Sequence, residues 1–250
     1  MRVVATYNIK GGVGKTSAAV NLGYLAARDG LRTLLWDLDP QGSATYLFRV
    51  KPKVKGGGKG LVTGRRSLDQ AIKETDFDRL DLMPADFSYR NLDLDLDSTK
   101  RPTDRLRRLV APLRHEYDLV ILDCPPSVSL VSENVVRACH VLLVPLIPAV
   151  LSLRTFDQLT DFVDGLPGRK PRLLAFLSMV DRRKKAHREL AERLPLERGS
   201  VVPEVIPNLA VVEQMARERA PVPDFAPRSP ATAAYEALWV RTRSCLDDIG

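Results

Sequence analysis

Runs of apolar residues alternate along the chain with segments in which apolar positions recur every three or four residues. The runs predict strands at residues 3–8, 32–37, 80–84, 119–123, 140–145, 172–179 and, as a short one, 201–206. The periodic segments predict helices at 15–29, 67–74, 103–114, 130–138, 152–166, 184–194, 211–219 and 232–246. Several runs are continuously apolar, as in strands whose two faces are both covered by helices. The pattern therefore predicts an α/β fold with a mostly parallel, twisted sheet.

One segment departs from this alternation. Between Arg49 and Arg66 there are seven lysines and arginines and no acid, and residues 51–60 read KPKVKGGGKG. So much glycine and lysine leaves little apolar surface to bury, and we expect residues 49–66 to form a mobile loop. The 250 residues otherwise suit a single domain that spans residues 1–250.

Composition narrows the class of protein. No apolar run is long enough to cross a bilayer, and the N-terminus has no signal-peptide pattern. Cys124, Cys139 and Cys245 are odd in number and widely spaced, which favours reduced thiols in the cytoplasm over disulfides or a metal site. The net charge of +7 permits a polyanionic partner.

The stretch at residues 7–20, YNIKGGVGKTSAAV, lies between the first predicted strand and the first predicted helix. It matches the phosphate-binding loop G-x-x-x-x-G-K-[ST], except that Ile9 replaces the first glycine and Lys10 stands beside it. Small residues there let backbone N–H groups approach phosphate oxygens at a helix N-terminus. Lys15 would reach the β- and γ-phosphates, and the Thr16 hydroxyl would bind Mg²⁺. The sequence predicts a nucleotide site.

Acidic residues at the ends of two other predicted strands support that site. Asp37 and Asp39 close the second strand in LLWDLDPQG, and Asp123 closes the fourth in LVILDCPP. The carboxyl ends of parallel strands share one edge of the sheet, where ligands of such folds bind. Asp123 suits the acid that holds Mg²⁺ through water.

These motifs together resemble the ParA/MinD family of ATPases with a deviant phosphate-binding loop, and within it the ParA partition ATPases. The resemblance rests on residues 10–16 (KGGVGKT), 37–42 (DLDPQG), 122–126 (LDCPP), 205–207 (VIP), 226–230 (APRSP) and 234–235 (AY). They are spread over nearly the whole chain. The resemblance implies a P-loop NTPase-like domain with ATP and Mg²⁺ as cofactors.

The resemblance also implies roles for particular residues. Lys10 would reach across a dimer interface to the ATP held by the other subunit, so that ATP joins two chains. Lys10, Lys15 and Asp39 would serve catalysis, and Thr16, Asp39 and Asp123 the metal. The implied nucleotide-binding residues are Lys10, Gly11, Gly12, Val13, Gly14, Lys15, Thr16 and Ser17, with Met179, Pro207 and Asn208 near the adenine.

ParA-like proteins bind DNA without sequence specificity through basic residues in their C-terminal half. The candidates in this chain are Arg182, Arg183, Lys184, Lys185 and Arg188, extended by Arg217 and Arg219. Such a cluster would contact the phosphate backbone. A solvated helix face balanced by acids is the alternative reading. An arginine common in the family is missing, because Val211 occupies its expected place.

The leading hypothesis is a dimerising ATPase associated with the nucleoid, which positions DNA or another large cargo with a ParB-like or cargo-adaptor partner. The alternative is a MinD-like cycle on membranes, which needs an amphipathic C-terminal helix. The tail AYEALWVRTRSCLDDIG carries a tryptophan but ends on acids that anionic lipid repels, so no membrane partner is expected. A metal-cluster ATPase of the nitrogenase iron-protein kind would need paired cysteines. The nature of the cargo stays open.

Overall fold

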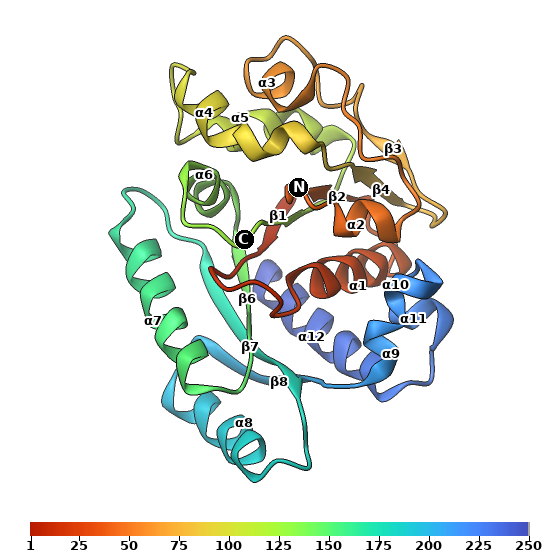
Figure 1. Cartoon of the computed structure of the whole chain (residues 1–250), viewed down its shortest axis with the longest axis vertical. Coiled ribbons are helices and arrows are strands. Elements are labelled where there is room, and N and C mark those ends of the chain that lie inside the picture. Colours follow the sequence, from red (N-terminus) through yellow and green to blue (C-terminus); the bar gives the residue numbers. More distant parts are fainter. Residues whose placement is uncertain (250) are drawn as a thin grey trace.

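The structure, a computed structural model that describes residues 1–249, is built on one eight-stranded sheet (Figure 1). The strands are β1 Arg2–Thr6, β2 Thr33–Asp37, β3 Lys73–Glu74, β4 Leu80–Met83, β5 Leu119–Asp123, β6 Val141–Leu146, β7 Arg172–Val180 and β8 Val201–Pro207. Their order is β3-β4-β2-β5-β1-β6-β7-β8, and all neighbours are parallel except β3 and β4. The predicted α/β class with a mostly parallel sheet is confirmed.

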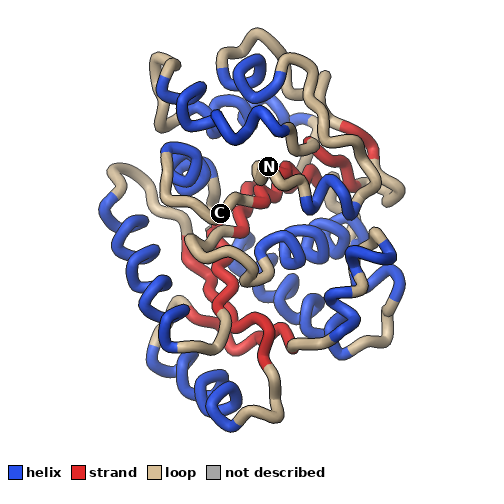
Figure 2. Tube along the Cα trace, viewed as in Figure 1, coloured by secondary structure: helices blue, strands red, loops and turns tan. Residues whose placement is uncertain are grey.

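Helices cover both faces of this sheet, and each face has its own apolar core (Figures 1 and 2). One face packs against α1 Lys15–Arg28, α2 Ser43–Leu47, α9 Ala210–Glu213, α10 Met215–Glu218, α11 Val222–Phe225 and α12 Pro230–Asp247. The other packs against α3 Gly57–Val62, η1 Phe87–Asn91, α4 Leu92–Asp97, α5 Arg105–Val110, η2 Ala111–His115, α6 Leu130–Ala138, α7 Val150–Gly165 and α8 Lys185–Glu197.

The continuous apolar runs form the central strands. Every residue of β2, β5 and β6 is buried, because helices cover both sides of each strand. The register places Thr6 beside Asp123 and Asp123 beside Asp37, at the carboxyl ends of β1, β5 and β2. Three polar residues that are far apart in sequence therefore meet at one edge of the sheet.

The helix predicted at residues 67–74 is wrong. This stretch makes a turn in which the amides of Ala71 and Ile72 donate to the Leu68 carbonyl, and it then enters the edge strand β3. The apolar period was only one turn long, too short to sustain a helix. Pairing of the β3 edge with β4 determined the structure instead.

Residues 49–66, which were expected to form a loop, contain a short helix. Residues 57–62 form α3, in which Gly58, Gly60, Leu61 and Val62 are buried. The helix packs closely, since a Cβ on Gly58 would lie 3.0 Å from Tyr89 Cδ1. The glycines that signalled disorder in the sequence are the residues that allow this contact.

Short elements account for most other differences from the prediction. The helix predicted at 211–219 is divided into α9 and α10, and Arg219, which caps the end of α10, has a left-handed φ of 52°. The sequence did not predict α2, η1, α4 or α11. Helices of four to six residues have too few turns for their apolar period to stand out.

Candidate nucleotide-binding site

The loop between β1 and α1 is held in shape by a buried asparagine. Asn8 Nδ2 donates to the Pro145 carbonyl at 2.8 Å, and Asn8 Oδ1 accepts from the Lys10 amide at 2.9 Å. Gly12 and Gly14 then take left-handed φ values of 69° and 98°. These turns bring the chain to the first turn of α1, where free N–H groups and the helix dipole favour an anion.

Gly14 is also required by its surroundings. A Cβ at this position would lie 2.8 Å from Ser178 Oγ on β7, closer than real Cβ contacts allow. Ser178 is itself buried, so it has little room to move away. The loop therefore needs glycine at residue 14 for its backbone angle and for its close approach to the sheet.

Lys15 lies inside the loop. Its Nζ donates to the Lys10 carbonyl at 3.1 Å, and only 7% of the residue is exposed. Burial lowers the pKa of the Lys15 ammonium below its ordinary value, an effect that the nearby Asp123 carboxyl partly opposes. The ammonium is thus held where it can meet phosphate oxygens, with few competing partners.

The acid at the end of β5 has an unused oxygen. Asp123 is fully buried; its Oδ1 accepts from the Thr6 hydroxyl at 3.3 Å, and its Oδ2 has no hydrogen-bond partner. Burial raises the pKa of this carboxyl, the neighbouring Asp37 raises it further, and the Thr16 hydroxyl lowers it. A buried carboxylate oxygen without a partner suits a cation or its water, so these residues fit a Mg²⁺ ion.

Asp37 has a structural role. Its Oδ2 accepts from the amide and the hydroxyl of Thr45, both at 2.8 Å, and its Oδ1 accepts from the Asp39 amide at 3.2 Å. Burial raises the pKa of Asp37, and the Thr45 hydrogen bonds oppose that shift. This carboxyl fixes the loop that carries Asp39.

Asp39 is half-buried and borders the loop of residues 11–17 across an open cavity of about 640 Å³. The cavity is lined by Gly11, Gly12, Val13, Gly14, Lys15, Thr16, Ser17, Asp39, Gln41, Ser43, Tyr46, Leu47, Pro126, Met179, Val212, Glu213, Met215 and Ala216. The structure thus brings the loop, Asp39 and Met179 together. The exposed Lys10 does not line this cavity.

Sequence reasoning missed some of the residues that line this cavity. Tyr46 comes from α2, and Val212 and Ala216 from the α9–α10 region. None of them belongs to a motif, and only folding places them opposite the glycine loop. Met179, which was predicted, has a left-handed φ of 58° that marks it as a special position.

Pro207 and Asn208 lie in a different cavity. They line one of about 520 Å³ together with Asp181, Arg182 and Arg183, and not the cavity of the glycine loop. The proposed contact of Pro207 and Asn208 with adenine therefore stays a prediction. In this structure they are grouped with the candidate DNA-binding residues.

All of those candidates except the half-buried Arg219 are exposed, and about half of them are in ion pairs. Arg183 bonds Asp181, and Lys185 approaches Glu189 at 3.5 Å. Arg182 and Lys184 lie before α8 and Arg188 on it, without an ion pair among the described residues. On α10, Arg217 lies 4.0 Å from Glu218, whereas Arg219 sits over the Tyr46 ring at 4.5 Å and donates to the Tyr46 carbonyl.

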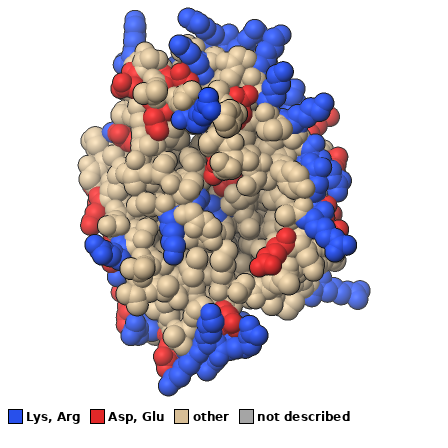
Figure 3. All heavy atoms as spheres, viewed as in Figure 1, with Lys and Arg blue, Asp and Glu red and all other residues tan. Residues whose placement is uncertain are grey.

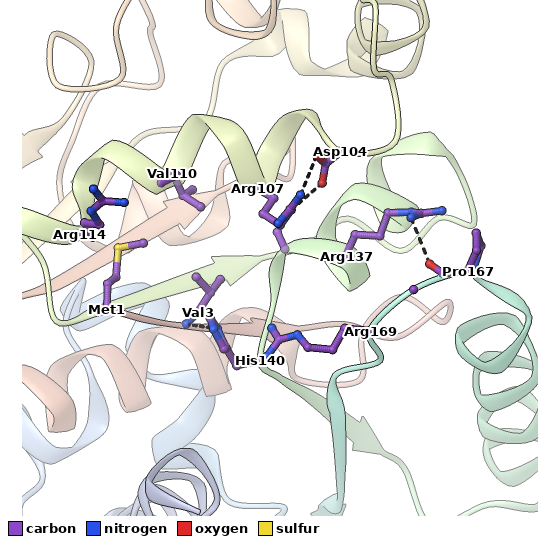
Figure 4. A pocket seen from close by; sticks show the side chains of 13 residues that line it. Met1, Val3, Asp104, Arg107, Val110, Arg114, Arg137, His140, Pro167 and Arg169 are labelled. Carbon is purple, nitrogen blue, oxygen red and sulfur yellow. Dashed lines mark hydrogen bonds and ion pairs between the residues drawn. The ribbon is translucent and has the colours of Figure 1, made fainter. Parts of the chain in front are cut away.

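A second large cavity, of about 550 Å³, lies at the opposite edge of the sheet (Figure 4). Met1 lines it from just before β1 and Val3 from within that strand, with Arg107 and Arg137 from the helices above. Both arginines are already engaged, Arg107 by Asp104 and Arg137 by Glu133. His140 Nδ1 accepts from the Val3 amide at 2.9 Å, and burial lowers the pKa of His140 to about 4.

The glycine loop after β1, its lysine, and the strand-end acids Asp39 and Asp123 on a parallel sheet define a P-loop nucleotide-binding protein. A family model described as an AAA domain (AAA_31) matches residues 1–174. The chromosome partitioning protein ParA of Caulobacter vibrioides is 34% identical over 222 residues, which cover 85% of this chain and 83% of that protein. The chain belongs to the ParA/Soj family of P-loop ATPases.

Two further comparisons extend over nearly the whole chain. The sporulation initiation inhibitor protein Soj of Bacillus subtilis is 30% identical over 240 residues, covering 94% of this chain and 95% of Soj. The structure of cobyrinic acid a,c-diamide synthase from Mycobacterium smegmatis, with a bound ATP analogue and magnesium, superposes with a TM-score of 0.80. It is 26% identical and covers 96% of this chain and 93% of that one.

Proposed function

We propose that this chain is an ATPase that dimerises on ATP and binds DNA without sequence specificity. Together with a ParB-like or cargo-adaptor partner that stimulates slow hydrolysis, it would position or segregate DNA or another large cargo in the cytoplasm, over the nucleoid. Support comes from its partition relatives and from a glycine loop that fits ATP and Mg²⁺.

The position of Lys10 is the observation that carries the proposal. Residues 11–17 all line the nucleotide cavity, but the exposed Lys10 does not. Its backbone is fixed at both ends, since its amide donates to Asn8 and its carbonyl accepts from Lys15. Lys10 thus lies on a fixed loop, beside its own nucleotide cavity but outside it. From this position it is well placed to reach a nucleotide in a second copy of the chain.

The chain's own residues have separate tasks in this mechanism. Lys15 neutralises phosphate charge from inside the loop, and Lys10 of the facing subunit adds a second cation at the transferring group. Asp39, on the loop that Asp37 fixes, orients the attacking water. Thr16 and Asp123 would hold Mg²⁺, directly and through water, and the ion would neutralise charge developing on the phosphate oxygens.

DNA contact is assigned to the turn before α8 and the first turns of that helix. Arg182, Lys184 and Arg188 are exposed and have no ion pair among residues 1–249, so they are available to phosphates. Each phosphate contact releases counterions, so binding should weaken steeply as salt rises.

A membrane cycle like that of MinD has less support. It requires bulky apolar side chains of a C-terminal helix to enter lipid. In α12, Trp239 and Leu246 are buried, and Trp239 Nε1 donates to Asp29 Oδ2 at 2.7 Å. Within residues 1–249, no helix is long and apolar enough to span a membrane.

The test of the proposal compares two lysine variants of the loop. Lys10→Ala should abolish ATP-dependent dimerisation measured by light scattering, because it removes the cation that acts across the interface. Lys15→Ala should instead abolish binding of a fluorescent ATP analogue, because it removes the cation inside the site. ATP-dependent dimers of Lys10→Ala as abundant as those of the parent would refute the role of Lys10.

A further inference from the structure

The segment at residues 49–66 is a folded element anchored to the region after β4. The Val54 amide donates to Asp86 Oδ2 at 2.8 Å, and the Gly58 amide donates to Ser88 Oγ at 2.8 Å. Gly57, with a φ of 61°, leaves no room for a Cβ, which would lie 2.7 Å from the same Ser88 Oγ. These contacts give the backbone of the segment one defined arrangement at residues 54–58.

Three other glycines of the segment make room for arginine side chains. A Cβ on Gly56 or on Gly60 would lie 3.3 or 3.4 Å from Cγ of Arg66, so the stem of Arg66 lies across the start of α3. A Cβ on Gly64 would lie 2.9 Å from Nη2 of Arg105, whose Nε donates to the Val62 carbonyl. The glycines thus leave room for both arginine side chains, and the hydrogen bond to Val62 positions the guanidinium group of Arg105.

Arg105 belongs to an open cleft between α3 and α5, with a volume of about 570 Å³. The cleft is lined by Val62, Thr63, Ser98, Thr99, Lys100, Arg101, Arg105 and Arg108. Arg108 is paired with Asp104, whereas Lys100, Arg101 and Arg105 have no ion pair within residues 1–249. A cleft whose charged lining is entirely cationic is suited to an anion.

The positive charge extends beyond the cleft over the surface of residues 49–66. We call the combined set the α3–α5 basic surface. It consists of nine cations without an ion pair among the described residues: Lys51, Lys53, Lys55, Lys59, Arg65, Arg66, Lys100, Arg101 and Arg105. Nine cations are more than a single small phosphate could neutralise, and they suit a repeating polyanion.

The chemistry of this surface favours a nucleic acid over a lipid bilayer. The larger apolar side chains of the segment, Val54, Leu61 and Val62, are buried in the core. Membrane-binding segments need such side chains on the outside, beside their cations. Apart from Pro52, the residues that the segment itself leaves exposed are polar, cationic or glycine, as at interfaces with a phosphate backbone.

The α3–α5 basic surface is separate from the residues near α8. Figure 1 shows α3, α4 and α5 at one end of the long axis of the molecule and α8 at the other. Lysines and arginines project at both ends in Figure 3. Contacts at the two ends can therefore be removed independently by substitution.

We propose that the α3–α5 basic surface binds the phosphate backbone of duplex DNA and forms a contact additional to the one near α8. The proposal extends the proposed function, on which it rests for the choice of DNA. Since none of the nine cations belongs to the glycine loop, the contact operates with ATP and with ADP. It reads no base sequence, because lysine and arginine on phosphates carry none.

The test is a charge-reversed variant of the full chain, Lys55→Glu/Lys59→Glu, measured with a fluorescent duplex of mixed sequence at two salt concentrations. The matched control is Arg169→Glu/Arg228→Glu, which changes net charge equally at exposed arginines outside the surface. A thermal melt checks that each variant folds. The test variant should bind DNA at least about tenfold more weakly than the control in both nucleotide states. Its salt slope should fall by about 2, or ~0.9 for each lost contact.

Three outcomes would overturn the proposal. The first is that both variants weaken DNA binding equally, which would indicate that only the net charge of the protein matters. The second is that neither variant weakens DNA binding. The third is a loss of binding to phosphatidylglycerol vesicles with DNA binding unchanged. If ATP still increases DNA affinity over ADP in any of these cases, the proposed function survives. If the parent chain binds no duplex with either nucleotide, both proposals fail.

Discussion

Thr45 links three segments around the nucleotide site, so replacing its hydroxyl is a sharp test of the site's construction. Its Oγ1 donates to Asp37 Oδ2 and accepts from the Ala85 amide, both at 2.8 Å, and the residue is fully buried. Thr45→Val keeps the shape of the side chain and removes both hydrogen bonds. Asp37 and the Ala85 amide are then left short of partners inside the core.

The expected cost follows from these two bonds. A buried amide without a partner costs about 1–3 kcal/mol, and a hydrogen bond to a charged carboxylate contributes about 1.5–3 kcal/mol. Because the Thr45 amide still donates to Asp37, we expect a loss near the lower part of the summed range, about 3 kcal/mol. In a chain of this size that lowers the melting temperature by roughly 6–12 °C.

The assay is urea unfolding followed by circular dichroism, with Thr45→Ser as the control. Serine keeps the hydroxyl and loses one methyl group, so it should cost roughly 1 kcal/mol. The loss in Thr45→Val should be larger above the pKa of Asp37 than below it, because the hydroxyl stabilises the ionised carboxylate. A valine variant within ~0.5 kcal/mol of the parent, or a serine variant equally unstable, would show that the hydroxyl does not hold these segments together.

Two further predictions concern the glycine loop and the opposite edge of the sheet. Gly14→Ala combines backbone strain with a clash at Ser178 and should weaken binding of a fluorescent ATP analogue at least about tenfold, roughly 1.4 kcal/mol. Gly30→Ala is the control, because its φ of 93° imposes similar strain with no heavy atom within 4 Å; equal losses of affinity would contradict the steric argument. Because folding lowers the pKa of His140 to about 4, the unfolded chain binds the proton first, and stability should fall as pH drops from about 6.5 towards 4. His140→Asn keeps an acceptor for the Val3 amide. In urea unfolding this variant should lose about 1–2 kcal/mol less stability than the parent over the same pH range, a figure reduced for the partial exposure of His140. An unchanged pH dependence would exclude His140 as its source.

Much of the candidate site could be predicted from the sequence, because many of its residues lie close together along the chain. The order glycine, lysine, threonine after an apolar strand requires only a strand, a turn and a helix start, and these form from neighbouring residues. The strand-end acids were also predictable, since parallel strands share one carboxyl edge. The contiguous residues 11–17 and Asp39 accordingly meet in one cavity.

The rest depended on contacts between distant segments. Tyr46 and Val212 join the nucleotide cavity from different helices, and no local pattern marks them. Pro207 and Asn208, which sequence reasoning placed near adenine, line the cavity beside Arg182 instead. Short helices are similarly hidden from periodicity, because they are stabilised by what they pack against.

The glycine-rich segment shows most clearly what each level determined. Its composition established a dense positive charge without acids, and that part of the prediction needed no structure. Whether the segment folds was decided by Ser88, Tyr89 and Leu92, which lie about thirty residues further along the chain and accept the close approach of Gly57 and Gly58. A residue without a side chain is the most flexible in isolation and the best able to pack tightly once a complementary surface is present. Sequence therefore determined the chemistry of this surface, and tertiary packing determined the helix and the contacts that its backbone makes.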